Sequence, residues 1–183
     1  MPTQQSSPRI AIVGGGIGGL TLALGLQRQG IACDVYEAVA EMKEIGVGIT
    51  LLPHAMRELA ALGLQAELEP QGIENLESVF FNRFGQYVYR EKRGRHAGYA
   101  VPEVGMHRGR LHATMYRAVL ARLGADRVHL SHRFTGLTQD EQQVTLNFEG
   151  QPSVQADVVI ACDGVNSAVR RQFYPQEKVA FAG

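Results

Sequence analysis

The sequence has no excess of charge of either sign. Its 183 residues include 18 lysines and arginines and 18 aspartates and glutamates, so the formal net charge at neutral pH is zero. Nucleic acids and anionic membrane surfaces attract proteins through clustered positive charge. The balance therefore argues against nucleic acid or a membrane as the main partner of this protein.

Long apolar runs are also missing. A membrane-spanning helix needs about 20 consecutive apolar residues, and no run in the sequence approaches that length. The start of the chain, MPTQQSSPRI, lacks the charged segment followed by an apolar segment that marks a secretory signal. We therefore expect a cytoplasmic protein whose residues 1–7 form a disordered tail.

Cysteine is scarce. The two cysteines, Cys33 and Cys162, both lie in apolar, strand-like runs, which is typical of reduced core residues in cytoplasmic proteins. No second pair of ligands has the spacing of a zinc site, so we expect neither a disulfide nor a metal. What remains is an ordinary globular composition, 45% hydrophobic and 20% charged, which suits one domain with a substantial core.

The N-terminal region predicts a strand, a helix and a second strand in close succession. Residues 9–13, RIAIV, form a β-branched run typical of a buried strand. A glycine-rich turn follows, and residues 20–29 have a helical composition that ends at Gly30. Residues 32–37, ACDVYE, predict the second strand. This order indicates a parallel strand pair joined by a helical crossover.

The glycines of the turn match the G-x-G-x-x-G pattern of a dinucleotide site. Gly14 permits the tight turn, Gly16 lets the backbone approach a pyrophosphate, and Gly19 allows close packing of helix on strand. The N-terminus of the following helix offers free N–H groups to the anion. Glu37, at the tip of the second strand, can accept hydrogen bonds from a ribose diol and disfavours the 2′-phosphate of NADP. On these residues alone, NAD and FAD both fit.

The rest of the chain predicts further helices and strands, with loops at 38–50 and 92–105. The predicted elements are a helix at 53–63, a hairpin at 76–91, an amphipathic helix at 109–123, and strands at 128–130, 134–137, 144–148, 154–155 and 157–161.

Three further segments favour FAD over NAD. The run His107-Arg108-Gly109-Arg110-Leu111 opens a helix, and Asp163-Gly164 follows the last buried strand. Residues 45–50, IGVGIT, form the loop after Glu37. An NAD-dependent Rossmann oxidoreductase, the competing hypothesis, has no role for Arg108 or for Asp163-Gly164.

These segments resemble, in order, the motifs of the FAD-dependent aromatic hydroxylases related to p-hydroxybenzoate and salicylate hydroxylases. The similarity is greatest to the branch that contains a phenazine hydroxylase, and it runs from about residue 8 to residue 183. The segments that carry it are GGGIGGLTLALGLQRQG, VYE, GVGITLLPHAMRELAALGL, HRGRLHATMYRAVLARLG and DVVIACDGVNSAVR.

The resemblance implies a role for each matching residue. Arg108 would reach the pyrophosphate and ribityl region of FAD, and Asp163 would hydrogen-bond ribityl or ribose hydroxyls. Ser167 and Arg170 would hold the pyrophosphate of NADH or NADPH, the transient electron donor. The complete set of residues expected to contact FAD is Gly14, Gly16, Gly18, Gly19, Glu37, Ala38, Gly46, Val47, Arg108, Leu130, Asp163 and Gly164.

The resemblance also implies the fold class, an α/β Rossmann-like FAD-binding fold with a central parallel sheet and a three-stranded β-meander at 133–156. Residues 8–73 and 106–183 would form the FAD-binding domain, incomplete at its C-terminus. Residues 74–105 would begin a substrate-covering β-sheet.

The implied function is that of the N-terminal part of a flavin monooxygenase, in which a flavin C4a-hydroperoxide hydroxylates a small aromatic substrate with O2. The sequence departs from the family at Ala161-Cys162, where Gly-Ala is usual, and at His54, where asparagine is common. The later Gly-Asp motif is absent, so we expect this chain alone to be inactive, with its catalytic base beyond residue 183. A homodimer is compatible with the resemblance, and the remaining alternative is a non-catalytic nucleotide-binding fragment.

Overall fold

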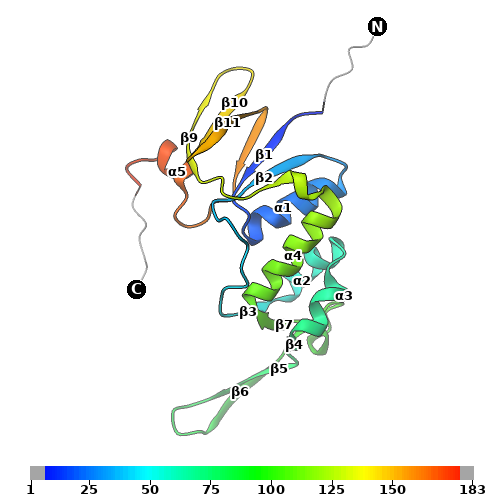
Figure 1. Ribbon diagram of the computed structural model, residues 1–183. Coiled ribbons are helices and arrows are strands. Elements are labelled where there is room, and N and C mark those ends of the chain that lie inside the picture. The colour runs from blue at the N-terminus through cyan, green and yellow to red at the C-terminus, as the bar shows by residue number, and fades with distance from the viewer. Residues whose placement is uncertain (1–6, 178–183) are drawn as a thin grey trace. The chain divides into compact units, whose positions relative to one another are not determined.

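The computed structural model describes residues 7–177, which form two compact units (Figure 1). The first unit combines the chain up to Met42 with the chain from Tyr116 onward, and the second is Lys43–Met115. Six of the seven residues of the expected N-terminal tail lie outside the described range. No helix in the described range is both long enough and apolar enough to cross a membrane.

A four-stranded parallel sheet forms the centre of the first unit. Its strands lie in the order β12 (Val158–Ala161), β1 (Ile10–Val13), β2 (Cys33–Tyr36) and β8 (Val128–His129), and every neighbouring pair is parallel. Strand β1 is almost fully buried because it lies between two neighbours. A strand in that position must be apolar on both faces, which explains the continuous run RIAIV.

Helix α1 (Ile17–Arg28) connects β1 to β2, as the sequence predicts. Its buried residues include Leu20, Ala23 and Leu24, a spacing that places them on one helical face. Gly30 follows the helix with a φ of +73°, a left-handed conformation that glycine adopts without strain.

A three-stranded antiparallel sheet packs beside the parallel one. Its order is β11 (Gln151–Ala156), β10 (Val144–Phe148) and β9 (Phe134–Gln139), which is the expected meander. One continuous core joins the two sheets and the short helix α5 (Ala168–Phe173); its buried members are Ala11, Val13, Tyr36, Leu137, Leu146, Phe148, Ala156 and Val169.

The second unit contains a three-stranded antiparallel sheet, which the sequence did not predict. Strands β3 (Gly48–Leu51) and β4 (Ile73–Glu74) flank β7 (Val104–His107). The first three residues of β3 and the first two of β7 fall in segments expected to be loops. The loop prediction is wrong for these residues. Both strands are only four residues long and pair across more than 50 residues of chain, which leaves little local signal.

The remaining elements of the second unit follow the sequence prediction more closely. Helix α2 (Pro53–Ala61) begins at its proline, and α3 (Gln65–Leu68) with a 3-10 turn, Glu69–Gln71, follows it. The expected hairpin is β5 (Glu77–Phe81) and β6 (Tyr87–Lys92), and a second 3-10 turn spans Gly94–Ala97. Helix α4 (Arg108–Leu123) starts in this unit and ends in the first, followed by a 3-10 turn at Ala125–Arg127.

Candidate dinucleotide-binding site

Two glycines of the turn after β1 are required by contacts within the chain. Gly14 has a φ of +106°, and a Cβ added there would lie 2.5 Å from the carbonyl oxygen of Cys162. A Cβ added at Gly19 would overlap the carbonyl oxygen of Gly14. These positions therefore bring β1, β12 and α1 close together at the carboxyl end of the sheet.

Gly16 differs, because no contact among residues 7–177 requires a glycine there. Its φ of −73° and ψ of −178° are extended values open to any residue, and an added Cβ would meet no atom within 4 Å. Gly16 is the N-cap of α1, and no side chain caps that end of the helix. The space beside Gly16, at the start of α1, is therefore not filled by any of the described residues, which suits the close approach of an anion to the helix N-terminus.

Glu37 directly follows β2 and is bound to the glycine turn. Its Oε2 accepts a hydrogen bond from the backbone N–H of Gly15 at 2.6 Å, and its Oε1 accepts one from Val39 at 3.0 Å. A carboxylate offers about four acceptor positions, so two bonds leave capacity for ribose hydroxyls. The Glu37 carboxylate is thus held in one orientation, and it can still accept further hydrogen bonds.

Asp163 and Gly164 form the turn after β12. Asp163 Oδ2 accepts hydrogen bonds from the backbone N–H groups of Ala168 at 2.7 Å and Val169 at 3.2 Å, and thereby holds the start of α5. Gly164 has a φ of +79°, which the turn requires. These bonds leave Asp163 Oδ1 to accept from a ligand hydroxyl.

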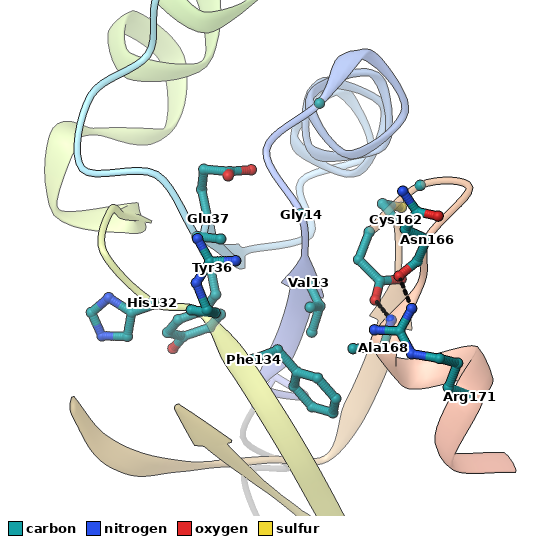
Figure 2. A pocket seen from close by; sticks show the side chains of 15 residues that line it. Val13, Gly14, Tyr36, Glu37, His132, Phe134, Cys162, Asn166, Ala168 and Arg171 are labelled. Atoms are coloured by element: carbon teal, nitrogen blue, oxygen red, sulfur yellow. Dashed lines mark hydrogen bonds between the residues drawn. The ribbon is translucent and has the colours of Figure 1, made fainter. Parts of the chain in front are cut away.

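The glycine turn, Glu37 and the Asp163 turn line one cavity of about 510 Å³ (Figure 2). Six predicted site residues are brought together there: Gly14, Gly16, Glu37, Ala38, Asp163 and Gly164. Gly18 and Gly19 lie in α1 behind the turn, and Leu130 precedes the lining residue His132 by two positions. The cavity has the size of a ligand pocket and lies at the carboxyl ends of parallel strands, where nucleotides bind in this fold class.

Several lining residues were missed by sequence reasoning. Tyr36 is buried, and its ring stacks on His129 at 4.6 Å and on Phe148 at 5.1 Å between centroids. Burial raises the pKa of Tyr36 to about 12, so the phenol stays neutral. His132 and Phe134 also line the cavity. The three lining rings come from β2, from β9 and from the segment between β8 and β9, so no local pattern could have grouped them.

Three predicted site residues lie in the second unit, where they form a group of their own. The backbone N–H of Arg108 donates to the carbonyl of Val47 at 2.9 Å. An added Cβ at Gly46 would lie 3.1 Å from the Cβ of Arg108. These contacts hold the segment just before β3 against the first residue of α4 within the unit, and the contact of the three residues with a cofactor stays a prediction.

Ser167 and Arg170 are engaged within the chain. The Ser167 side chain is buried and its Oγ accepts a hydrogen bond from the backbone N–H of Arg170 at 2.8 Å, as the N-cap of α5. The Arg170 guanidinium donates to the carbonyl of Val165 at 2.6 Å and pairs with Glu177 at 3.2 Å. Both residues hold the segment after β12 in shape, and neither lines the cavity in Figure 2.

A family described as "FAD binding domain" matches residues 8–179, which is nearly the whole chain. The chain belongs to this family. This membership supports FAD as the bound cofactor and favours it over the NAD of the competing Rossmann oxidoreductase. The open Gly16, the uncapped end of α1 and the fixed carboxylate of Glu37 fit a pyrophosphate and an adjoining ribose.

The similar proteins include several that are named as hydroxylases or monooxygenases. Phenazine 1,6-dicarboxylic acid hydroxylase PhzS of Lysobacter antibioticus is 36% identical over 181 residues, covering 94% of this chain and 44% of the relative. The 6-hydroxynicotinate 3-monooxygenase of Bordetella bronchiseptica is 32% identical, covering 98% and 46%. The predicted family resemblance is confirmed, and this chain spans a little under half the length of these relatives.

Solved structures agree on the fold. Klebsiella pneumoniae HpxO complexed with FAD and uric acid superposes with a TM-score of 0.75 at 29% identity, covering 92% of this chain and 42% of that one. The 2,6-dihydroxypyridine-3-hydroxylase of Arthrobacter nicotinovorans gives a TM-score of 0.75 at 28% identity, covering 94% and 41%. The predicted Rossmann-like α/β class is therefore confirmed.

Proposed function

We propose that this chain is the FAD-binding part of a flavin monooxygenase that uses NADH or NADPH and O2 to hydroxylate a small aromatic substrate. Family membership and the hydroxylase names of the relatives support the proposal. The observation that carries it is Gly16, which no contact within the chain explains, at an uncapped helix N-terminus in the same cavity as Glu37.

The residues of the chain bind and orient the cofactor in this proposal. The N–H groups at the start of α1 receive the pyrophosphate, and Glu37 accepts hydrogen bonds from a ribose. Asp163 Oδ1 accepts from a cofactor hydroxyl, and backbone near Leu130 lies against the adenine. Gly46, Val47 and Arg108 supply the contacts on the ribityl side.

FAD supplies the redox chemistry when it is bound, whereas the protein contributes position and electrostatics. Activation of a phenol requires a base close to the aromatic ring. We assign no catalytic residue within residues 7–177.

Residues 74–105 are proposed as the beginning of a substrate-covering sheet. Hairpin β5–β6 carries two aromatic pairs, Phe80 with Tyr89 and Phe81 with Tyr87, whose ring centroids are 6.1 and 6.3 Å apart. All four side chains are about half exposed or more. A two-stranded hairpin is only marginally stable by itself, so these aromatic rings suit a sheet that gains further strands or a packing partner.

Gly16→Ala tests the proposal directly. We expect it to weaken FAD binding about tenfold or more, because the added methyl group would occupy space taken by the pyrophosphate. The unfolding midpoint should stay unchanged, since the backbone is extended and the Cβ meets no atom of the chain. FAD affinity is measured by titration of the purified chain, followed by flavin fluorescence.

Gly25→Ala is the matched control, because Gly25 lies in the same helix and an added Cβ there also meets no atom within 4 Å. It should leave FAD affinity unchanged and stabilise the protein by about 0.5–1 kcal/mol, the usual gain when alanine replaces glycine inside a helix. Equal FAD affinity of Gly16→Ala and the unaltered chain, or no FAD binding by the unaltered chain, would contradict the proposal.

A further inference from the structure

The charges around the cavity do not all remain available to a ligand. The lining residues include two carboxylates, Glu37 and Asp163, and two guanidinium groups, Arg133 and Arg171. Arg133 pairs with Glu149, with 3.5 Å between Nε and Oε2. Among residues 7–177, no carboxylate pairs with Arg171. This arginine is therefore the lining cation whose charge is left to balance a bound anion.

The position of Arg171 is set by one hydrogen bond to the turn after β12. Its Nη1 donates to the backbone carbonyl of Asn166 at 2.7 Å. Figure 2 shows the side chain running from α5 back toward the loop that carries Asn166, beside Ala168. The other N–H groups of the guanidinium remain as donors.

Arg170, the residue before Arg171, has different partners. Arg170 donates to Val165 and pairs with Glu177, and it is not among the cavity-lining residues. Successive residues of a helix point about 100° apart, so the two side chains leave α5 in different directions. The structure places Arg171 at the cavity.

We propose that Arg171 binds a phosphate oxygen of the dinucleotide in this cavity. A planar guanidinium donates in parallel to two oxygens of a phosphate, and such charge-assisted bonds are stronger than neutral ones. Without Arg171, the two carboxylates of the lining would face a doubly charged pyrophosphate with no unpaired cation to offset them. The proposal rests on the proposed function, because it assumes that this cavity receives a dinucleotide.

The test compares the unaltered chain with Arg171→Gln, Arg171→Lys and Arg28→Gln. Arg28 is exposed at the end of α1 and does not line the cavity, so its variant removes the same charge elsewhere. FAD and adenosine are titrated at low and high salt, and NADH is titrated into the FAD-saturated chain. The unfolding midpoint of each variant is measured in parallel.

We expect Arg171→Gln to weaken the binding of FAD, or of NADH to the FAD-saturated chain, about tenfold. The salt dependence of that ligand should become shallower, because one charge contact is lost. Adenosine binding should not change. Arg171→Lys should retain part of the affinity, and Arg28→Gln all of it. Which of the two dinucleotides is affected identifies whose phosphate Arg171 contacts.

Three results would overturn the inference. If the unaltered chain binds FAD and Arg171→Gln binds both dinucleotides equally well, the inference fails while the proposed function stands. If Arg171→Gln loses adenosine and FAD to the same extent, together with a lower unfolding midpoint, Arg171 has only a structural role. If the unaltered chain binds no FAD, the inference and the proposed function fail together.

Discussion

At the scale of single residues, the two acids of the site hold backbone groups as well as offering oxygens to a ligand. Glu37 fixes the glycine turn through Gly15, and Asp163 fixes the start of α5 through Ala168 and Val169. An acid whose orientation is already set loses little conformational entropy when a ligand binds. Substituting either acid should therefore change local structure and affinity together.

Asp163→Ala is expected to lower both stability and FAD affinity. The loss of its two backbone hydrogen bonds at the start of α5 should cost about 1 kcal/mol, as for other capping residues. The loss of Oδ1 should weaken FAD binding. Chemical unfolding and FAD titration measure the two effects separately.

Asp140→Ala provides the comparison. Asp140 accepts backbone hydrogen bonds from Gln142 and Gln143, each at 2.8 Å, in an exposed turn outside the cavity. This variant should lose some stability and no FAD affinity. An Asp163→Ala variant as stable as the unaltered chain would contradict the capping role.

At the scale of elements, α5 is attached to β9 by one side chain. Gln172 accepts a hydrogen bond from the backbone N–H of Leu137 at 2.9 Å and donates to its carbonyl at 2.6 Å. Gln172 of α5 thus fills the backbone hydrogen bonds that a further strand would make at the edge strand β9. These two bonds hold α5, and with it Ala168 and Arg171, beside the cavity. Because α5 is only six residues long, its stability must come from such contacts.

We expect Gln172→Ala to destabilise the protein by about 1–3 kcal/mol, because it leaves the N–H and carbonyl groups of buried Leu137 without partners. Gln139→Ala, at the exposed end of the same strand, should change stability by less than about 0.5 kcal/mol. Denaturant midpoints measure both changes. Equal midpoints for the two variants would show that α5 does not depend on this bridge.

At the scale of the whole molecule, two buried groups in the parallel sheet make stability depend on alkaline pH. Burial raises the pKa of the Cys33 thiol to about 11 and that of the Tyr36 phenol to about 12. The unfolded chain releases these protons near their ordinary pKa values of 9.0 and 10.0. At pH values between the unfolded and the folded pKa of each group, the folded chain binds more protons than the unfolded chain. Raising the pH through this range therefore favours unfolding.

The melting temperature should therefore fall as the pH rises above about 9, through the window set by Cys33 and then by Tyr36. Cys33→Val removes the ionisable thiol, so its melting temperature should begin to fall about one pH unit later. Melting curves from pH 7 to pH 11 compare the two proteins. The same pH profile for both would show that Cys33 does not contribute.

The sequence by itself determined the strand–helix–strand order, the glycine pattern, Glu37 and the family. These features depend on neighbours within a few positions, and glycine, proline and periodic apolar residues specify them locally. The later motifs also lie within single helix starts and turns. For this reason, six of the residues that the sequence named as cofactor contacts are among those lining the cavity in the structure.

Only the tertiary structure decided which residues share that cavity and what each one contacts. The pairing of β3 with β7 and the stacking of Tyr36 on His129 join residues that are far apart in the chain. The difference between Arg171, which lines the cavity, and Arg170, which does not, depends on the direction of each side chain. A sequence pattern carries little information about such contacts, because they arise from packing between elements. The contacts of the three pattern glycines likewise separated Gly14 and Gly19, where an added Cβ would overlap other atoms, from Gly16, where it would meet none among the described residues.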